Sequence, residues 1–469
     1  MNKRIHSAVC MALLSSAAPP ISLAQTGDNA PSAATELPKL VEWDDTKFRS
    51  RIEAIDLTWA GHRARADILM TEDNQLIGYY DANRQLTIAY RKGLGNPWNY
   101  HKLPSWLGWD SHNSVALGVD EAGYIHVMAN MHADPIVYFQ SEKPWNVRSI
   151  VQHKGLVNDA YEERVTYPHF MNDRQGRLIA KFRSGGSGNG IELYHRFDTK
   201  TKSWSRMHGG GPLVDGEGER NGYFKGPDLG PDGYYHLTWV WRETPSANTN
   251  HDLSYARSKD LDNWETSDGK PLTLPMTLST SEIIEPVPVG GGILNGQHRL
   301  GFDSDKKPMI SYYKYDQKGD TQIYLLRKTA QGWKSDQISN WTGSRQELDR
   351  QGSLANTVSV SADPEIAADG SITVQAIRDG VITQWQVNAK TNKVMAVTTI
   401  SDPLPAQILS EKAKREMPFH FAKATGKGTG VFADYDWYLT WHALPANQDV
   451  ARDDIPSPSV LRLIPVPKK

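Results

Sequence analysis

Residues 120–145 read DEAGYIHVMANMHADPIVYFQSEKPW and contain the unit from which the chain is built. A turn with Asp and Gly comes first, followed by an alternating apolar strand, a second strand with a tyrosine, and a tryptophan. Short alternating runs bounded by turn residues are typical of half-buried β-strands. Comparable units begin at Glu72, Asp173, Asp232, Asp303 and Asp369, and the last of them lacks the closing tryptophan.

These six units follow one another at intervals of roughly 50–70 residues, the range of propeller blades with long loops. A four-stranded blade cannot bury both faces alone, so blades must stack in a ring. The segment GVFADYDWYLTWHA (430–443), paired with strands near Ile52 to Trp59, is expected to close a seventh unit. We therefore predict an all-β protein, a seven-bladed β-propeller. The regular repeats disfavour the alternative, a β-sandwich, and only Ala406 to Glu416 has helical spacing.

The N-terminus predicts export. Lys3 and Arg4 precede a short apolar stretch at residues 7–18, and small residues up to Ala24 offer a cleavage site. This order is typical of a secretory signal peptide, and the apolar stretch is too short to cross a bilayer. We expect a secreted or periplasmic protein with a signal peptide at 1–24, a flexible leader at 25–40 and a single catalytic propeller domain at 41–469.

Composition and charge exclude several classes of function. Cys10 is the one cysteine and lies in the predicted signal peptide, so the mature chain has neither disulfides nor thiolate chemistry. Without Lys3 and Arg4 the chain has 50 basic and 54 acidic residues, a formal charge of about −4. No basic run suggests nucleic acid, and no later stretch is apolar enough to span a membrane. We expect a monomer.

Four segments combine titratable side chains with turn sequences. Three of their residues, His112, Tyr167 and Arg183, lie at equivalent ends of neighbouring units, so their side chains are expected to converge on one mouth of the propeller. Each residue taken alone is more typical of packing or of surface charge. The segments are WDSHNS (109–114), NMHADP (130–135), YEERVTYPHF with FRSGG (161–170 and 182–186), and RNGYFKGP (220–227).

Three longer runs carry a resemblance to a known family. They are WDSHNSVALGVDEAGYIHVMANMHADPIVYFQS (109–141), VTYPHFMNDRQGRLIAKFRSGGSGNGIELYHRFD (165–198) and GPDGYYHLTWVWRETPSANTNHDLSYARSKDLDNWE (230–265). They resemble the seven-bladed propeller ulvan lyases, polysaccharide lyase family twenty-five and the related family twenty-four. The resemblance implies a secreted lyase that cleaves ulvan, a sulfated rhamnose–uronate polymer, by β-elimination at the uronic acid, leaving an unsaturated uronate end.

The resemblance also implies roles for particular residues. His112 matches the family's catalytic histidine, Tyr167 a catalytic tyrosine, and Arg183 the arginine that neutralises the uronate carboxylate. His132 and Tyr223 match substrate-contacting positions. Two neighbours of these residues, Asn113 and Arg220, complete the predicted substrate contacts.

The same resemblance raises the question of a metal. Some members of the family carry a structural zinc with histidine and cysteine ligands, and His251 and His298 are the candidate ligands here for a structural zinc or calcium ion. Ser254 stands where a cysteine is expected, which puts zinc binding in doubt. No cofactor is expected to be required for the chemistry itself.

β-Elimination explains why these residue types suit the reaction. Removing the C5 proton of a uronate places a second negative charge beside the carboxylate, so a cation that stays charged and binds bidentately is needed, as Arg183 can. An unperturbed histidine has a pKa of about 6.5, which suits this residue type, and hence His112, to the role of base. Tyr167 could protonate the leaving oxygen, or act as the base if an arginine lowers its pKa. The sequence leaves these two assignments open.

Three rival functions remain at this stage. A propeller glycoside hydrolase needs a pair of carboxylates, for which Glu162, Glu163, Asp110 and Asp228 are available. A lyase acting on another glucuronate glycan, such as a rhamnosyl-glucuronate, would differ only in its pocket. A glycan-binding module would equally use the abundant Trp and Tyr.

Overall fold

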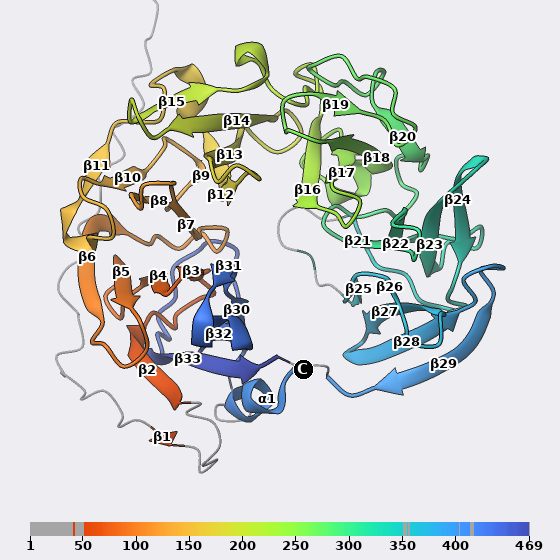
Figure 1. Ribbon diagram of the computed structural model, residues 1–469. Helices are drawn as coiled ribbons and strands as arrows, with labels where there is room; N and C mark the ends of the chain where they lie inside the picture. Colours follow the sequence, from red (N-terminus) through yellow and green to blue (C-terminus); the bar gives the residue numbers. More distant parts are fainter. Residues whose placement is uncertain are drawn as a thin grey trace, which may run out of the picture. The chain divides into compact units, whose positions relative to one another are not determined.

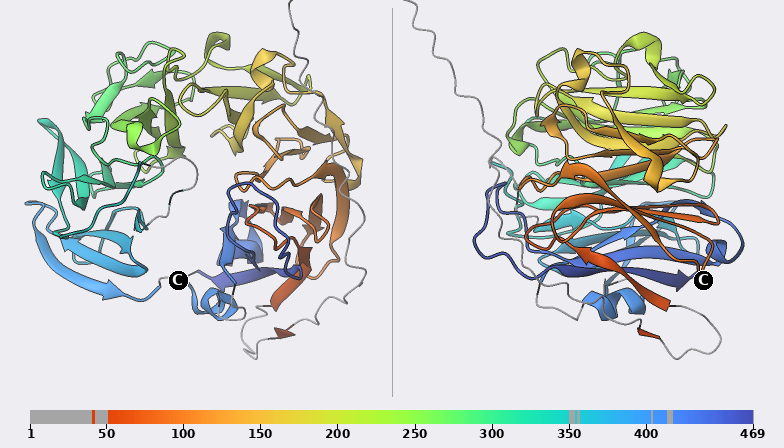
Figure 2. Two further views of the ribbon diagram at one scale, coloured as in Figure 1. Left: turned by 180° about the vertical axis from the view of Figure 1, so that it is seen from behind. Right: turned by 90° about the vertical axis from the view of Figure 1, so that its left-hand side faces the viewer.

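The fold is built from short antiparallel sheets that follow one another along the chain (Figure 1). The structure, a computed structural model, describes residues 41–42, 51–349, 354, 357–402, 404–412 and 417–468, which all belong to the compact unit Leu37–Lys469. The predicted signal peptide and the leader up to residue 40 lie outside the described residues. Within this unit the described strands form seven sheets arranged in a ring, which confirms the predicted seven-bladed propeller (Figures 1 and 2).

Six sheets are formed mainly by consecutive strands, in the order in which the sequence units occur. The first three sheets contain β3 (Asp67–Glu72), β4 (Asn74–Tyr80), β5 (Gln85–Lys92) and β6 (Asn99–Trp106) with β31 (Thr425–Gly428); β7 (Val115–Val119), β8 (Ile125–Ala129), β10 (Tyr138–Ser141) and β11 (Ile150–His153); and β12 (Val165–Asn172), β13 (Leu178–Ser184), β14 (Ile191–Asp198) and β15 (Ser203–Arg206) with β9 (His132–Asp134). The next three contain β16 (Asn221–Leu229), β17 (Tyr235–Arg242), β18 (Asn250–Ser258) and β19 (Trp264–Glu265) with β20 (Glu282–Glu285); β21 (His298–Phe302), β22 (Pro308–Tyr315), β23 (Thr321–Thr329) and β24 (Gly332–Gln337); and β25 (Val358–Val360), β26 (Glu365–Ile366), β27 (Ile372–Arg378), β28 (Val381–Val387) and β29 (Val394–Ile400).

The seventh sheet joins the two ends of the described chain. It contains β30 (Phe419–Lys423), β32 (Tyr435–His442), β33 (Ser459–Pro467), β2 (Arg51–Thr58) and β1 (Val41–Glu42). The prediction that 430–443 pairs with the strand near Ile52 is wrong in one respect, because β33 lies between β32 and β2 and pairs with both. Backbone hydrogen bonds thus join residues near opposite ends of the sequence within one sheet.

Helices play a small part. The predicted helix begins at Ala406, as α1 (Ala406–Lys412), and the described residues also contain five short 3₁₀ turns, at Val147–Ser149, Ala160–Glu162, His208–Gly210, Ala247–Thr249 and Gly430–Asp434. No helix in the described ranges has the length and apolar character needed to span a membrane.

Aspartate turns join strands within the sheets. Asp120 Oδ1 accepts hydrogen bonds from the backbone N–H groups of Ala122 and Tyr124, at 3.0 and 2.8 Å, and Gly123 supplies the positive φ of 85° that the turn requires. Asp173 makes the same two contacts with Gln175 and Arg177. The Ser258 to Trp264 hairpin is likewise structural, since the Ser258 hydroxyl accepts the Leu261 N–H at 2.8 Å.

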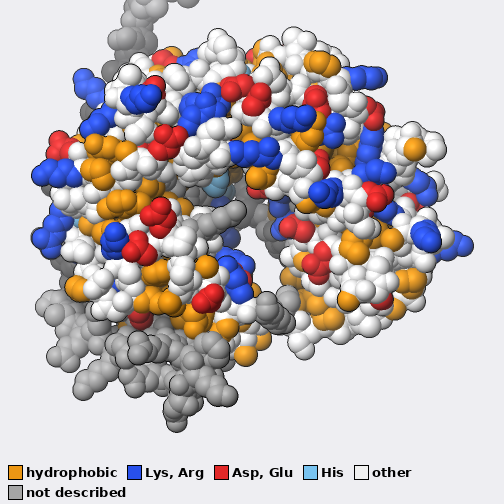
Figure 3. Space-filling view, viewed as in Figure 1, with side chains coloured by type: hydrophobic (Ala, Val, Ile, Leu, Met, Phe, Trp, Pro, Cys, Tyr) orange, Lys and Arg blue, Asp and Glu red, His pale blue; other side chains and the backbone are white. Residues whose placement is uncertain are grey.

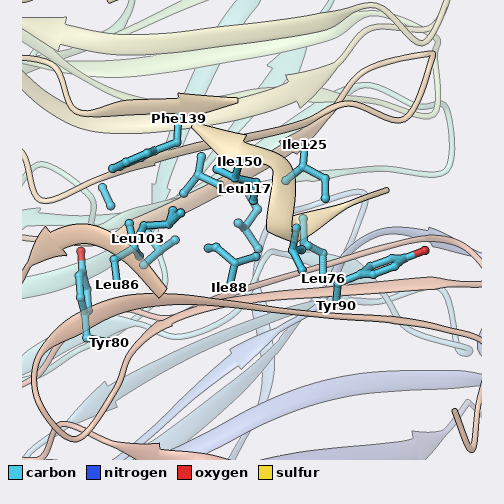
Figure 4. Close-up of a cluster of buried hydrophobic side chains, with 14 of the residues drawn as sticks. Leu76, Tyr80, Leu86, Ile88, Tyr90, Leu103, Leu117, Ile125, Phe139 and Ile150 are labelled. Atoms are coloured by element: carbon cyan, nitrogen blue, oxygen red, sulfur yellow. The ribbon is translucent and has the colours of Figure 1, made fainter. Parts of the chain in front are cut away.

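The hydrophobic core lies between neighbouring sheets. One cluster joins Leu76 and Ile88 of the first sheet to Leu117, Ile125 and Phe139 of the second, all at most 4% exposed (Figure 4). Burying each large apolar side chain contributes about 1.5–3 kcal/mol. The sheets are therefore held at fixed positions relative to their neighbours, which places the strand ends that carry polar side chains.

Tryptophans near the outer strands contact the preceding sheet. Trp204 Nε1 donates to the Tyr138 hydroxyl at 3.0 Å, and Trp145 stacks on Tyr90 with ring centroids 5.8 Å apart. Each of these aromatic side chains extends from its own sheet to the one before it. The recurrent tryptophan of the sequence thus belongs to the interface between sheets.

We predict that Trp204→Ala lowers the free energy of unfolding by about 3–5 kcal/mol, because it leaves a cavity among buried aromatic rings. Chemical denaturation followed by circular dichroism measures the change. Trp106→Ala is the matched control, since Trp106 is 58% exposed and its loss should cost at most about 0.5 kcal/mol. Equal effects from the two substitutions would contradict this account of sheet packing.

Candidate active site

Two histidines share one carboxylate at the start of the second sheet. The turn before β7 places Asp110 Oδ1 2.8 Å from both the backbone N and the Nδ1 of His112. Asp110 Oδ2 lies 2.6 Å from the Nδ1 of His132, on β9. The two imidazole rings are stacked, with centroids 4.2 Å apart and planes inclined by 23°. The structure therefore brings together the two histidines that the sequence placed in separate segments.

This geometry determines where the protons lie. Burial raises the pKa of Asp110, but hydrogen bonds from His112 and His132 outweigh burial and hold that pKa well below its usual range. An ionised carboxylate only accepts hydrogen bonds, so each Nδ1 must carry a proton. In the neutral imidazoles the Nε2 atoms are then free to accept a proton, which is what a general base requires.

Tyr167 lies beside this pair on a distorted part of β12. The register with β13 shifts between Thr166 and His169, and Tyr167 has a φ of 56°, in the left-handed region. Such a backbone costs on the order of 1–3 kcal/mol in a non-glycine residue. The phenol ring is 6.3 Å from the His132 ring between centroids, and the side chain is 41% exposed.

Three arginines act on the Tyr167 hydroxyl electrostatically. The Cζ atom of Arg183, near the end of β13, lies 5.0 Å from the centre of the Tyr167 ring. Arg242, at the end of β17, and Arg65, just before β3, also act on Tyr167 electrostatically. Burial raises the pKa of Tyr167, and the three guanidinium groups oppose that rise without cancelling it.

None of these arginines is neutralised by the described part of the chain. Across those residues, no carboxylate lies within ion-pair distance of Arg65, Arg183 or Arg242. Arg183 is only 5% exposed, and its Nε has no hydrogen-bond partner there. A buried cation without a counterion is costly. Arg183 is therefore a buried guanidinium that is able to pair with a negatively charged group, whereas Arg242 donates to the backbone carbonyls of Thr244 and Ser246.

Tyr223 borders the cluster on the next sheet. Its hydroxyl lies 2.7 Å from Ser187 Oγ and accepts a long hydrogen bond of 3.5 Å from Arg242. Arg242 also lies over the Tyr223 ring, with its Cζ 5.3 Å from the ring centre. The structure thus places Tyr223 beside the group that contains Tyr167, at the predicted mouth. Figure 3 shows a histidine on the wall of the central hollow, with Lys and Arg side chains close by.

The two remaining predicted substrate contacts have other surroundings. Asn113 is 6% exposed, in the same turn as His112, and its Oδ1 has no hydrogen-bond partner among described residues. Arg220 donates to Glu243 at 2.8 Å and Glu219 at 2.9 Å, and these carboxylates raise its pKa. The guanidinium of Arg220 is therefore already paired, which disfavours the predicted contact with an acidic substrate.

The structure gives the two predicted metal ligands separate partners. His251 contacts Glu243 and Asp252, at 2.7 and 3.0 Å, while His298 Nε2 lies 2.9 Å from the hydroxyl of Thr238. Ser254, where a cysteine was expected, accepts a hydrogen bond from Trp241. The prediction of a shared site is therefore not supported.

A different trio could hold a metal ion. Among the described residues, the one group of three close ligands is Asp110, His112 and His132. Its carboxylate oxygens already accept both Nδ1 protons at hydrogen-bond distances. A metal ion would have to displace these protons. The donor set suits a transition metal such as zinc, but the geometry fits a hydrogen-bonded triad better.

Sequence patterns did not identify the part that three residues play in this site. Asp110 was considered only as a hydrolase carboxylate, and Arg65 and Arg242 were not considered. The sequence does contain a signal for Arg242. Arg242 is the last residue of the second strand of its sheet, and Arg183 lies one residue before the end of the corresponding strand one unit earlier. The sequence contains no comparable signal for Arg65, since this residue belongs to a loop before the first unit.

Comparison with known proteins adds curated relatives of limited extent. The chain is 28% identical over 139 residues to an ulvan lyase, long isoform, of Alteromonas sp. (strain LOR), covering 26% of this chain and 13% of that protein. It is 30% identical over 67 residues to the corresponding protein of Glaciecola sp. (strain KUL10), covering 14% of this chain and 7% of that protein. The matched segments thus span only a small part of these relatives.

Solved structures share the fold over most of the chain. The polysaccharide lyase Uly1 superposes with a TM-score of 0.58 at 13% identity, covering 85% of this chain and 89% of its own. A family twenty-five ulvan lyase bound to -[GlcA(1-4)Rha3S]- gives a TM-score of 0.55 at 12% identity, covering 88% and 96%. The resemblance to propeller ulvan lyases is therefore confirmed at the level of the fold. The sequence model of the BNR repeat-containing family matches residues 74–341, more than half of the 469 residues, and the chain belongs to that family.

Proposed function

We propose that the protein is a polysaccharide lyase that cleaves a uronate-containing glycan by β-elimination. One observation carries the proposal: Arg183, which has no carboxylate partner among the described residues, lies over the Tyr167 ring, beside two histidines held by one aspartate, and Arg65 and Arg242 add positive charge to that ring. The arginines suit the carboxylate of a uronate and the charge that develops on it during proton removal. Arg183 is the member in closest contact with the phenol ring.

The remaining groups suit the two proton transfers. An Nε2 of the His112–His132 pair takes the C5 proton, and the electrons of that C–H bond form the C4–C5 double bond. The C4–O bond breaks, and its electron pair stays on the leaving oxygen, which Tyr167 protonates. Burial keeps the pKa of Tyr167 raised, which favours the protonated phenol and hence the role of acid.

The proposed substrate is ulvan, cleaved at the uronic acid to leave an unsaturated uronate end. The names of the matched relatives and the oligosaccharide bound to one structural neighbour support this choice. The alternative is another glucuronate glycan, such as a rhamnosyl-glucuronate. The N-terminal 24 residues support action outside the cytoplasm, in the periplasm or after secretion.

A hydrolase is less well supported by the same residues. The carboxylate of Glu162 accepts backbone hydrogen bonds from Leu156, Val157 and Asn158, so it stabilises a loop. Asp110 is occupied by two imidazoles. These contacts leave neither group free to act as one of a pair of catalytic carboxylates.

The decisive test is the product formed from ulvan. We expect absorbance to rise in the near ultraviolet, because the new C4–C5 double bond is conjugated with the carboxylate. His112→Ala and Arg183→Ala should lower turnover by at least about 100-fold, and Arg183→Lys should also fail because the point charge of lysine cannot replace the bidentate guanidinium.

Arg148→Ala is the matched control for loss of a cation, since Arg148 is exposed and lies in a short 3₁₀ turn away from the cluster. New reducing ends without absorbance would identify a hydrolase. Binding without either signal would identify a glycan-binding module. Retention of most turnover by Arg183→Ala would refute the role given to Arg183.

Asp110→Asn should reduce both activity and stability. It removes the carboxylate that fixes the Nδ1 protons, and loss of such an orienting group can cost about 10⁴-fold in turnover. Because the pKa of Asp110 is depressed in the folded state, its stabilisation is complete above the ordinary aspartate pKa of about 3.9 and is lost as pH falls further.

The difference in melting temperature between wild type and Asp110→Asn should therefore be largest near neutral pH and shrink below about pH 4. Thermal unfolding monitored over this pH range measures it. A difference that stays constant down to strongly acidic pH would show that Asp110 is not held ionised by the two histidines.

Metal removal should leave turnover unchanged, because Asp110 already binds both Nδ1 protons directly. Protein dialysed against a chelator is compared with untreated protein, using initial rates of absorbance change on ulvan. Protein from which the chelator has been removed, with zinc added back, serves as the control. Loss of turnover that zinc restores would instead assign an ion to Asp110, His112 and His132.

A further inference from the structure

A pocket lies between the seventh sheet and the segment before β3. It has a volume of about 320 Å³ and is formed where the start of β30 faces the segment before β3. Two arginines and four rings line it, namely Arg63, Arg65, Phe419, His420, Phe421 and Trp441. Neither the catalytic scheme nor the comparisons assigns it a role.

The pocket adjoins the candidate active site through Arg65. The carbonyl oxygen of Arg65 accepts the Val115 N–H at 3.0 Å, beside the turn that carries His112. Arg65 lines this pocket and also acts on Tyr167 electrostatically. In the seventh sheet, Trp441 of β32 pairs with His420 of β30. In the third sheet, Arg183 of β13 pairs in the same way with Thr166 of β12. The pocket thus lies beside strands of the seventh sheet that correspond to the strands carrying Tyr167 and Arg183 in the third.

The pocket has positive charge that the described residues do not balance. Within that part of the chain, no carboxylate lies within ion-pair distance of Arg63 or Arg65, and the buried Nε of Arg63 has no hydrogen-bond partner. Burial and the neighbouring Arg65 both lower the pKa of Arg63. Two like charges held together in a cavity favour an anionic ligand.

The aromatic rings indicate that this anion belongs to a sugar. Phe421 is 44% exposed, although it lies beside Phe419 with ring centroids 6.3 Å apart. His420 packs on Trp441 at 5.8 Å, and burial together with Arg63 lowers the pKa of His420 to about 4, so the ring is neutral near pH 7. A small inorganic anion makes no use of exposed ring faces, whereas a sugar presents apolar C–H groups to them.

We propose that this pocket is a second glycan subsite, which binds an anionic sugar residue through Arg63 and Arg65 and stacks it on Phe421. The proposal rests on the proposed function, because one glycan chain would pass from this pocket to Tyr167. The anionic group is a uronate carboxylate or a sulfate ester, since both match the guanidinium fork.

Binding measured without turnover tests the subsite. In a Tyr167→Phe background, calorimetry compares three probes: oligogalacturonate, which carries carboxylates; a carrageenan oligosaccharide, which carries sulfates; and a neutral xylo-oligosaccharide. Arg63→Gln should weaken a charged probe about tenfold, the value of one charge-assisted hydrogen bond, and leave the neutral probe unchanged. Phe421→Ala, at an exposed position, should weaken the same probe without disturbing the fold.

Lys423→Gln is the matched control, because Lys423 is on the same strand but is exposed and paired with Asp436. Weakening confined to oligogalacturonate assigns a carboxylate, and weakening confined to the carrageenan probe assigns a sulfate ester. If Arg63→Gln and Phe421→Ala both bind every charged probe like their parent, the subsite does not exist. Absorbance on ulvan reports the lyase separately, so either proposal can fail while the other stands.

Discussion

The proposed chemistry depends on keeping like charges together without neutralising them. Arg65, Arg183 and Arg242 all act on Tyr167, and their mutual repulsion opposes that arrangement. Arg183 and Arg242 come from the third and fourth sheets and Arg65 from the loop before β3, and the apolar cluster that contains Tyr194 and Trp239 packs the third sheet against the fourth. Apolar packing between the sheets therefore offsets the repulsion among the three arginines. A negatively charged substrate relieves the repulsion, so the same arrangement that is unfavourable in the empty protein favours binding and transition-state stabilisation.

Local sequence patterns were sufficient to predict most of the fold. Each of the six units has its own aspartate turn and alternating strands, so short-range rules identify them without reference to the rest of the chain. The seventh sheet is different, because β2 and β33 come from near opposite ends of the sequence and neither follows such a turn. Pairing between residues separated by some 400 positions leaves no local signal. Local patterns therefore do not predict β33, and they pair β32 with β2, which is the partner of β33.

The site was predicted less completely, for the same reason. His112, His132, Tyr167 and Arg183 lie in recognisable segments, whereas their mutual geometry depends on how separate sheets meet. Asp110 could not be identified as the link between two histidines until β9 was placed against β12, which brings His132 back towards the turn before β7. Arg220 shows the converse problem. It precedes Tyr223 closely in sequence, but Glu243 at the end of the neighbouring strand neutralises it.

The distortion at Tyr167 connects the two halves of the proposed chemistry. A residue before proline normally adopts an extended backbone, so a left-handed Tyr167 before Pro168 is unfavourable. The Thr166 hydroxyl accepts the Ala133 N–H at 2.8 Å, and Thr166 pairs with His132 across the strands. The residue next to the strained position is thereby tied to the segment that carries one histidine. Regular alternation along β12 would change the direction of the phenol, so the irregular backbone and this hydrogen bond together fix the proposed acid relative to the proposed base.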